Sequence, residues 1–376
     1  MIGPYQVCAR WLRRHAFVRR PVLRIGAEAE LLVHTADSGR PAALEADGPA
    51  ILPLLRSFAS ERGWSMTASD KGPRFRAPDG GSISLEPGGQ IEYATRPHDS
   101  PRALHSDLVS TLRALHARAA DHGLVLIPAG IEPDHGIDAS PLLLDTPRYR
   151  RMDAYFAAIG EAGARMMRQT AALQINVDAD DPIDAWRTLN AAAPVLVAAF
   201  ANSARYAGRD TGYASYRAET WRHVDPLRSG VLPDGEPPDV YAVFALRAPA
   251  MLMPRTLRAL PFAEHLRLGA RSAAWREHLT TLFPEVRPKG YLEVRSIDAQ
   301  PIDALAPPLL LVSTLARDAE ARRTARELIG PADPALLARA ARHGTSDPDL
   351  ARLAGELMSL VTLRAERTGI GVGFEE

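Results

Sequence analysis

Carboxylate and amide side chains recur at alternating positions in several short segments of this sequence. In residues 82–93, Glu86 precedes a Pro-Gly-Gly break, and Gln90 and Glu92 follow it. The alternate positions hold Ile83, Leu85, Ile91 and Tyr93. Alternation with a period of two predicts a half-buried strand, and the internal glycine pair predicts a bulge or a close backbone approach. Two carboxylates and an amide on the polar face make this strand a candidate metal or phosphate site.

Three other segments have the same design. Their polar faces carry, in chain order, Glu28 and Glu30 of 24–33, Gln174, Asn176 and Asp178 of 172–178, and Glu293 and Arg295 of 291–295. Strands with one apolar and one polar face are typical of antiparallel sheets packed on one side. We therefore expect an α+β fold, in which a curved, mainly antiparallel sheet lines a polar cavity and helices cover its outer face. For any single strand a solvated polar face is the alternative, and the repetition favours a shared cavity.

A shared cavity would gather several acidic side chains. Two carboxylates about 4 Å apart repel by roughly 4 kcal/mol at an effective dielectric constant near 20. Gathering five of them therefore requires cations: Glu28, Glu30, Glu86, Glu92 and Glu293. Oxygen ligands suit hard ions such as Mg²⁺ or Mn²⁺, and Mg²⁺ commonly shares its coordination shell with substrate phosphates.

Composition narrows the class of protein. The chain has 376 residues, 46% of them hydrophobic, which is enough for a large core. Lys+Arg and Asp+Glu both number 45, so no net charge favours binding to nucleic acid or to an anionic membrane. Cys8 is the only cysteine, which excludes an internal disulfide and a thiolate zinc site. The arginine-rich N-terminus has no uninterrupted apolar region, so we expect a cytoplasmic protein.

The order of patterns along the chain suggests three parts. We expect an N-terminal helical tail at 1–21, a catalytic core at 22–300, and a C-terminal segment of about three helices at 301–376. Within the core we expect helices at 48–63, 100–123, 148–167 and 185–207, a strand at 125–131, and loops at 71–81 and 132–147. His135 lies in the second loop, as a metal ligand or, more commonly for a loop histidine, as a solvated side chain. The irregular stretch 202–234 is a candidate substrate loop.

One motif resembles that of a known family. Ser84-Leu85-Glu86-Pro87-Gly88-Gly89-Gln90 is similar to the signature of glutamate–cysteine ligases of the plant and actinobacterial type, which include the first enzyme of ergothioneine biosynthesis. The similarity continues in the family's order through 24–30, 166–170, 174–178, 200–203, Tyr216-Arg217 with Trp221, Asp225, Arg228 and Gly230, 278–287 and 291–295. It covers roughly residues 22–300.

The resemblance implies a catalytic core like those of glutamine synthetase and guanido kinases. ATP would phosphorylate the side-chain carboxylate of glutamate, and the amine of cysteine would attack the acyl phosphate. By the same analogy one Mg²⁺ would be held by Glu28, Gln174 and Glu293, and another by Glu30, Glu86 and Glu92. Arg295 and Glu293 would act at the transferred phosphoryl group, and the substrates would be bound by Arg217, Trp221, Arg168, Gln90 and Asn176. Arginine suits such a site because guanidinium stays charged and binds phosphate in a fork.

Some positions depart from the family pattern. Ala29 stands where relatives often have His, and Ala171-Ala172 stand where they often have Thr or Cys. These departures leave open the same ligase chemistry with another amine acceptor. A metal-dependent hydrolase is a further alternative, disfavoured because arginines crowd the metal motifs and paired histidine ligands are missing from them. A catalytically idle amino-acid-binding relative is disfavoured because every metal-type residue is present. The oligomeric state stays open.

Overall fold

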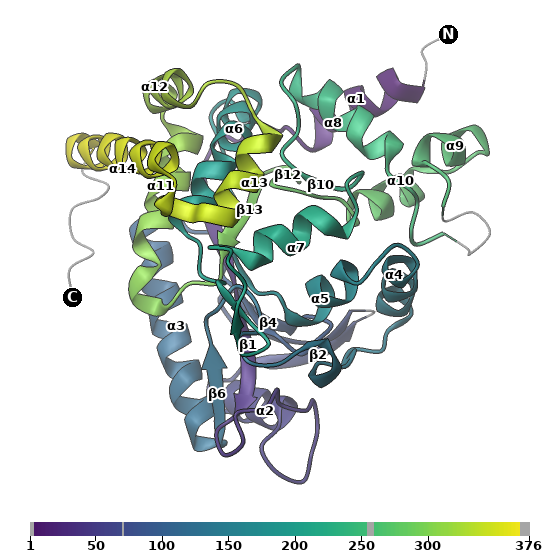
Figure 1. Ribbon diagram of the computed structural model, residues 1–376, viewed down its shortest axis with the longest axis vertical. Coiled ribbons are helices and arrows are strands. Elements are labelled where there is room, and N and C mark those ends of the chain that lie inside the picture. The colour runs from purple at the N-terminus through teal and green to yellow at the C-terminus, as the bar shows by residue number, and fades with distance from the viewer. Residues whose placement is uncertain (1–3, 70, 254–258, 369–376) are drawn as a thin grey trace.

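The structure is a computed structural model that describes residues 4–69, 71–253 and 259–368. Within these residues a nine-stranded sheet forms the centre of the fold (Figure 1), and its strand order is β12-β13-β7-β1-β5-β4-β3-β2, with β6 also paired to β1. Its strands are β1 (Ile25–Thr35), β2 (Ser65–Ser69), β3 (Gly72–Arg76), β4 (Ser82–Leu85), β5 (Ile91–Ala94), β6 (Leu124–Ile127), β7 (Ala172–Val177), β12 (Val286–Pro288) and β13 (Leu292–Asp298). All of their pairings are antiparallel, which confirms the predicted sheet type.

The register of the sheet brings the acidic strands side by side. Glu28 of β1 lies opposite Gln174 of β7, and Glu30 lies opposite Glu92 of β5. Glu293 of β13 lies opposite Asn176 on the other edge of β7. Because side chains at alternate positions share one face, these pairings place the acidic residues on one face of the sheet.

Helices cover the apolar face of the sheet. They include α2 (Ile51–Glu61), α3 (Pro101–Asp121), α6 (Pro182–Ala199) and α11 (Ala306–Arg317). The i, i+4 stripe of α3 is fully buried, and its residues are Leu104, Leu108, Leu112 and Leu115. Ser100 caps this helix by accepting a hydrogen bond from the backbone N–H of Ala103, which lies 3.2 Å away. The predicted α+β architecture with helices on the outer face is thus confirmed.

Both ends of the described chain are helical. Helix α1 (Pro4–His15) packs on α8 (Pro237–Arg247), and its Leu12 is completely buried. At the other end α12 (Ala319–Ile329), α13 (Pro334–His343) and α14 (Pro348–Thr368) gather around α6 (Figure 1). Helices were expected in both places, whereas the boundaries at residues 21 and 300 stay predictions. In the described ranges we find no helix long and apolar enough to cross a bilayer.

Several local predictions were wrong in detail. The single helix expected at 148–167 is two helices, α4 (Pro147–Ala157) and α5 (Ala162–Gln169), and Gly160 lies between them with φ +153°. The helix expected at 185–207 begins three residues earlier, at Pro182, and ends at Ala199. The loop expected at 71–81 contains β3, which pairs with β2 and β4.

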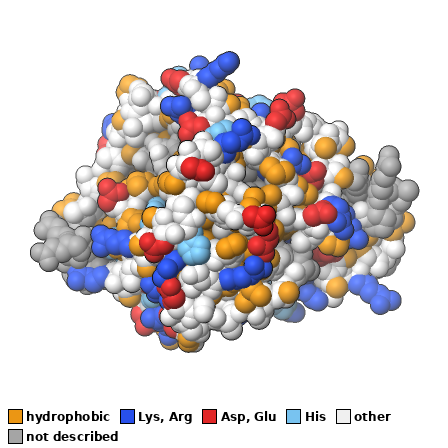
Figure 2. Space-filling model, turned by 90° about the horizontal axis from the view of Figure 1, so that it is seen from below, with side chains coloured by type: hydrophobic (Ala, Val, Ile, Leu, Met, Phe, Trp, Pro, Cys, Tyr) orange, Lys and Arg blue, Asp and Glu red, His pale blue; other side chains and the backbone are white. Residues whose placement is uncertain are grey.

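The candidate substrate loop 202–234 also contains regular structure. Its longest element is α7 (Tyr216–Val224), which Ser215 caps, and the remainder includes the short strands β8 (Arg205–Tyr206), β9 (Arg209–Asp210) and β10 (Ser229–Gly230). Further along the chain lie α9 (Phe262–Arg267), α10 (Ser272–Leu279) and β11 (Phe283–Pro284). Figure 2 shows the face of the molecule that lies lowest in Figure 1, where basic and acidic side chains are interspersed.

Candidate active site

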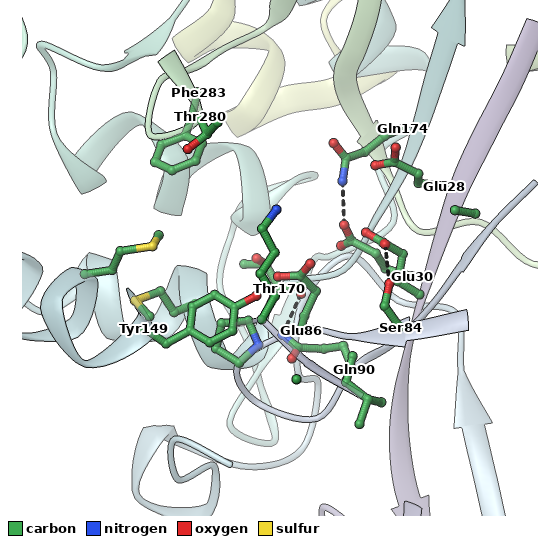
Figure 3. Close-up of a pocket in the computed structure, with 18 of the residues that line it drawn as sticks. Glu28, Glu30, Ser84, Glu86, Gln90, Tyr149, Thr170, Gln174, Thr280 and Phe283 are labelled. Carbon is green, nitrogen blue, oxygen red and sulfur yellow. Dashed lines mark hydrogen bonds between the residues drawn. The ribbon is translucent and has the colours of Figure 1, made fainter. Parts of the chain in front are cut away.

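A polar cavity of about 300 Å³ lies on the acidic face of the sheet. Strands β1, β4, β5, β7 and β13 form its floor, and helices α4, α5 and α7 contribute the opposite wall. Figure 3 shows Glu28, Glu30 and Gln174 close together on the sheet side, with Tyr149 and Phe283 on the opposite side. Of the residues predicted from the sequence, the lining includes Glu28, Glu30, Glu86, Gln90, Glu92, Gln174, Trp221, Glu293 and Arg295.

The Glu30 carboxylate is held in place through both of its oxygens. One of its oxygens accepts a hydrogen bond from Gln174 Nε2 at 2.6 Å, and the other accepts from the backbone N–H of Ala172 at 2.8 Å. Glu92, on the neighbouring strand, accepts from Ser84 Oγ at 2.8 Å. These contacts fix the direction of the carboxylates, so the register of the sheet determines where any cation would bind.

The acidic side chains perturb one another strongly. Burial raises the pKa of Glu86 to about 8, and the nearby Glu30 carboxylate adds to the shift. Burial and the charge of Glu28 raise the pKa of Glu92 well above its ordinary value. The pKa of Glu30 is also raised by burial, and Arg217 and Arg295 offset only part of that effect. Carboxylates that resist ionisation because of each other favour the binding of cations, since a cation removes the repulsion.

Glu293 behaves differently from the other carboxylates. It is completely buried, yet the combined charges of Arg287, Lys289 and Arg295 outweigh the effect of burial and hold its pKa well below the ordinary range. Arg287 Nε lies 2.5 Å from one carboxylate oxygen, and Lys289 Nζ lies 2.7 Å from the other. Arg295 is 3.3 Å from the first oxygen and also donates to the side-chain oxygen of Gln174. Glu293 thus holds three cations at one edge of the cavity.

Cationic residues that we did not assign from the sequence also line the cavity. They are Lys71, Arg74, Arg148, Arg287 and Lys289. The sequence does contain a pattern that indicates Arg287 and Lys289. They alternate along 286–289 just before a glycine, as residues on one face of a hairpin strand do. Lys71 lies in the turn between β2 and β3, and Arg74 lies in β3, both within the segment expected to be a loop. Positive groups around a floor of carboxylates can neutralise the charge of a bound polyphosphate.

The turn between β4 and β5 is held tightly against α5. Gln90 accepts a hydrogen bond from the backbone N–H of Gly88 at 3.0 Å and donates to the carbonyl of Thr170 at 2.9 Å. A Cβ added to Gly88 would lie 2.1 Å from the carbonyl oxygen of Arg168, so only glycine fits there. Of the two expectations for the glycine pair, a bulge or a close backbone approach, Gly88 shows the close approach. The Gln90 side chain thus links the turn to the backbone that follows α5.

Three predicted substrate-binding residues lie outside the lining of the cavity. Asn176 donates to Glu28 Oε1 at 3.0 Å, and Arg168 forms an ion pair with Asp153 at 2.5 Å. Arg217 is buried, with Asp298 3.5 Å away, and donates to the carbonyl of Arg295 at 2.8 Å. It lines a separate, water-sized cavity that shares Trp221, Phe283 and Arg295 with the large one. These contacts place Asn176 and Arg217 directly behind residues that face the cavity.

The donor atoms of the cavity fit a hard divalent cation. They are carboxylate and amide oxygens held at fixed positions by the sheet, and several of the carboxylates have raised pKa values. Mg²⁺ and Mn²⁺ prefer such oxygen ligands, whereas the described residues that line the cavity offer no imidazole or thiolate to a softer ion.

Comparisons with known proteins give a consistent result. The model of the family described as glutamate-cysteine ligase family 2 matches residues 24–370. Glutamate–cysteine ligase EgtA of Mycolicibacterium smegmatis is 37% identical over 312 residues, which are 77% of this chain and 72% of that protein. The chloroplastic glutamate–cysteine ligase B of Oryza sativa subsp. japonica is 30% identical over 299 residues, which are 74% of this chain and 59% of that protein. A crystal structure of glutamate–cysteine ligase from Francisella tularensis in complex with AMP covers 93% of this chain and 82% of that one, with 13% identity and a TM-score of 0.48.

Proposed function

This chain belongs to glutamate–cysteine ligase family 2, as its motifs indicated, and from that premise we propose that it forms γ-glutamylcysteine from glutamate and cysteine. It is a glutamate–cysteine ligase-like enzyme, and its family is ATP-dependent. In the proposed reaction the side-chain carboxylate of glutamate attacks the γ-phosphorus of ATP and ADP leaves. The nitrogen of cysteine then attacks the carbonyl carbon of the γ-glutamyl phosphate, and inorganic phosphate leaves as the amide bond forms.

The observation that carries this proposal is the cavity itself. It combines a floor of carboxylates with arginines and lysines along its edges, as transfer of a phosphoryl group between two anions requires. When bound, Mg²⁺ would be held by these carboxylates and would supply neutralisation of the negative charge that develops on the transferred phosphoryl group. We propose Glu30, Glu86 and Glu92 as ligands of one ion, and Glu28 with Gln174 as ligands of another.

Glu293 was expected to bind the second ion as well, but its contacts favour a different role. Both of its oxygens are in ion pairs with Arg287 and Lys289, and Arg295 lies at the same carboxylate. We propose that Glu293 positions Arg295 and Lys289, which stabilise the transferred phosphoryl group directly. Asn176 and Arg217 would act through Glu28 and Arg295, respectively.

Cysteine is the acceptor that the site supports best. Met152, Met166 and Met167 line the cavity and offer an adaptable, weakly polar surface for a small thiol-bearing side chain. Ala29 and Ala171, the departures from the family pattern that suggested another acceptor, do not line the cavity. Ala29 packs in the main apolar core, and Ala171 is completely buried in a small cluster with Leu32 and Ala299.

The test is release of ADP and phosphate by the purified protein. We expect turnover only when glutamate, cysteine and Mg²⁺ are present together, and a product with the mass of γ-glutamylcysteine. A panel of other amines should give lower kcat/KM values than cysteine. Turnover with none of the amines would contradict the ligase proposal. Amide hydrolysis without nucleotide would favour the hydrolase alternative.

A further inference from the structure

A second group of ligand-type side chains lies outside the cavity, where His34, Glu132 and His135 converge. We propose that these three residues form a binding site for a borderline transition-metal ion of the Zn²⁺ class. The proposal does not depend on the ligase reaction, because none of the three residues lines the cavity.

The distances suit coordination of a single ion. His34 Nε2 lies 2.7 Å from Glu132 Oε2, and His135 Nδ1 lies 3.1 Å from Glu132 Oε1. One potential ligand atom from each residue lies within 4.8 Å of the other two. Zinc bonds of about 2.0–2.2 Å in a tetrahedral site place ligands roughly 3.3–3.6 Å apart. Side-chain movements of about 1 Å would therefore bring the two imidazole nitrogens and the carboxylate oxygen to distances that suit one ion.

The backbone holds these residues in place before any ion binds. His34 is in β1, where it pairs with Val125 of β6 and forms a bridge to Pro41. The backbone N–H of Glu132 donates to the carbonyl of Gln169 at 2.8 Å. Because a strand and an anchored segment supply the ligands, little conformational freedom would be lost on binding.

The alternative is a network of hydrogen bonds without metal. Glu132 accepts from both imidazoles and from the backbone N–H groups of Asp134 and His135, at 3.1 and 3.2 Å. The Glu132 carboxylate therefore lies between two imidazoles, with one of its oxygens facing each. A divalent ion would replace the two imidazole protons that face this carboxylate, which is the exchange that metal binding to histidine involves.

Access from solvent is available on one side only. The side chains of His34 and Glu132 are 5% and 3% exposed, whereas that of His135 is 22% exposed. An ion could enter past His135 and keep a water molecule there as its fourth ligand. Two histidines and one glutamate with an open fourth position are a ligand set that Zn²⁺ commonly uses.

The site is separate from the acidic cavity in position and in chemistry. His34 is four residues beyond Glu30 on β1, which corresponds to about 13 Å along the strand. Leu32, between them, packs with Ala171 and Ala299 and closes the space. Imidazole nitrogens favour Zn²⁺ or Co²⁺, whereas the all-oxygen cavity favours Mg²⁺.

An ion at this site would strengthen one wall of the cavity. Gln169 donates to the carbonyl of His135 at 3.0 Å, and the next residue, Thr170, lines the cavity and accepts from Gln90. Fixing residues 132–135 to β1 would therefore stiffen the segment that enters β7. We expect a higher Tm on binding of Zn²⁺ and little direct effect on phosphoryl transfer.

The experiment uses Co²⁺ as a spectroscopic probe of the untagged protein in saturating Mg²⁺. We expect visible absorption bands of four-coordinate Co²⁺ at one ion per chain, displaced by Zn²⁺. His34→Gln and His135→Gln should each weaken binding at least tenfold. His223→Gln, at an exposed histidine, should not change it, and Glu86→Gln should keep the bands because Glu86 lies in the other site. Absence of the bands, or bands that survive both histidine variants, would overturn the proposal.

A second measurement needs no variant and so does not depend on folding of the substituted proteins. Zn²⁺ should protect His135 of the wild-type protein from diethyl pyrocarbonate, as mapped by peptide mass, while exposed His223 continues to react. Equal modification of His135 with and without Zn²⁺ would also overturn the proposal.

Discussion

Arg287 of β12 lies directly opposite Glu293 of β13, and its Nε is 2.5 Å from the buried carboxylate. Lys289 and Arg295 lie at the same carboxylate, so one anion holds three cations that line the cavity. This arrangement distinguishes Glu293 from Glu30, which accepts hydrogen bonds from Gln174 and the backbone of Ala172, and from Glu92, which accepts one from Ser84. Removing its charge should therefore have a different consequence from removing theirs.

Glu293→Gln should reduce both stability and activity. Three cations would lose their common partner in a buried site, and breaking a buried ion pair in this way typically costs about 3–5 kcal/mol. We expect that loss in the free energy of unfolding measured with urea, together with a large fall in kcat. Unchanged stability in the absence of Mg²⁺ would contradict the positioning role and return Glu293 to the metal ligands.

Glu86→Gln should have the opposite effect on stability. The pKa of Glu86 is raised to about 8 in the fold from an ordinary value of 4.5. The folded state therefore binds more protons than the unfolded state between these values, and its stability falls as pH rises through about 8. Without Mg²⁺ at pH 8–9, the variant should be at least as stable as the wild type, because a repelled charge is gone.

The same variant should lose ATP turnover and most of the rise in Tm that Mg²⁺ produces. Its matched control is Glu45→Gln, at an exposed carboxylate paired with Arg56 outside the cavity. The control should keep both properties. Near-native kcat in Glu86→Gln would show that the carboxylate does not bind a required ion.

The face on which the catalytic-type residues lie followed from the sequence, because a period of two leaves no choice of side for Glu28 and Glu30. The order of the strands was not accessible in the same way, since pairing of β7 between β1 and β13 depends on long-range contacts. The family resemblance indicated that acidic residues of separate strands belong to one site, which periodicity alone could not show. What it could not supply was the set of partners of Glu293, because Arg287 and Lys289 approach only once the β12–β13 hairpin has formed.

Arg217 illustrates a second limit. Its position in a family motif suggested direct contact with substrate, but α7 turns the side chain toward Asp298 and the backbone of Arg295. A motif fixes the identity of a residue, whereas the direction of its side chain depends on the helix that carries it. Here the cap at Ser215 sets the start of α7 and thereby the face on which Arg217 lies.

Gly88→Ala should damage the site without removing any functional group. The added Cβ would lie 2.1 Å from the carbonyl oxygen and 2.6 Å from the Cα of Arg168, and both are backbone atoms that cannot rotate away. The turn or α5 must move, which typically costs about 1–3 kcal/mol and would displace Glu86. We expect lower stability and at least a tenfold loss of kcat. Gly48→Ala is the control, because nothing lies within 4 Å of a Cβ there.

His278 should make the fold sensitive to mild acid. It is buried, stacks on Phe262 with ring centroids 4.3 Å apart, and its Nε2 lies 2.7 Å from the carbonyl oxygen of Ala245. Burial lowers its pKa from 6.5 to about 3, so below pH 6.5 the unfolded chain takes up a proton that the folded chain does not. Stability contributed by this residue is thus complete above pH 6.5 and is lost as pH falls toward 3, by about 1.4 kcal/mol per pH unit.

Urea unfolding of His278→Gln between pH 7 and pH 4.5 should give a shallower dependence on pH than the wild type, whereas His223→Gln should not. Parallel curves for the wild type and His278→Gln would show that the acid sensitivity arises elsewhere.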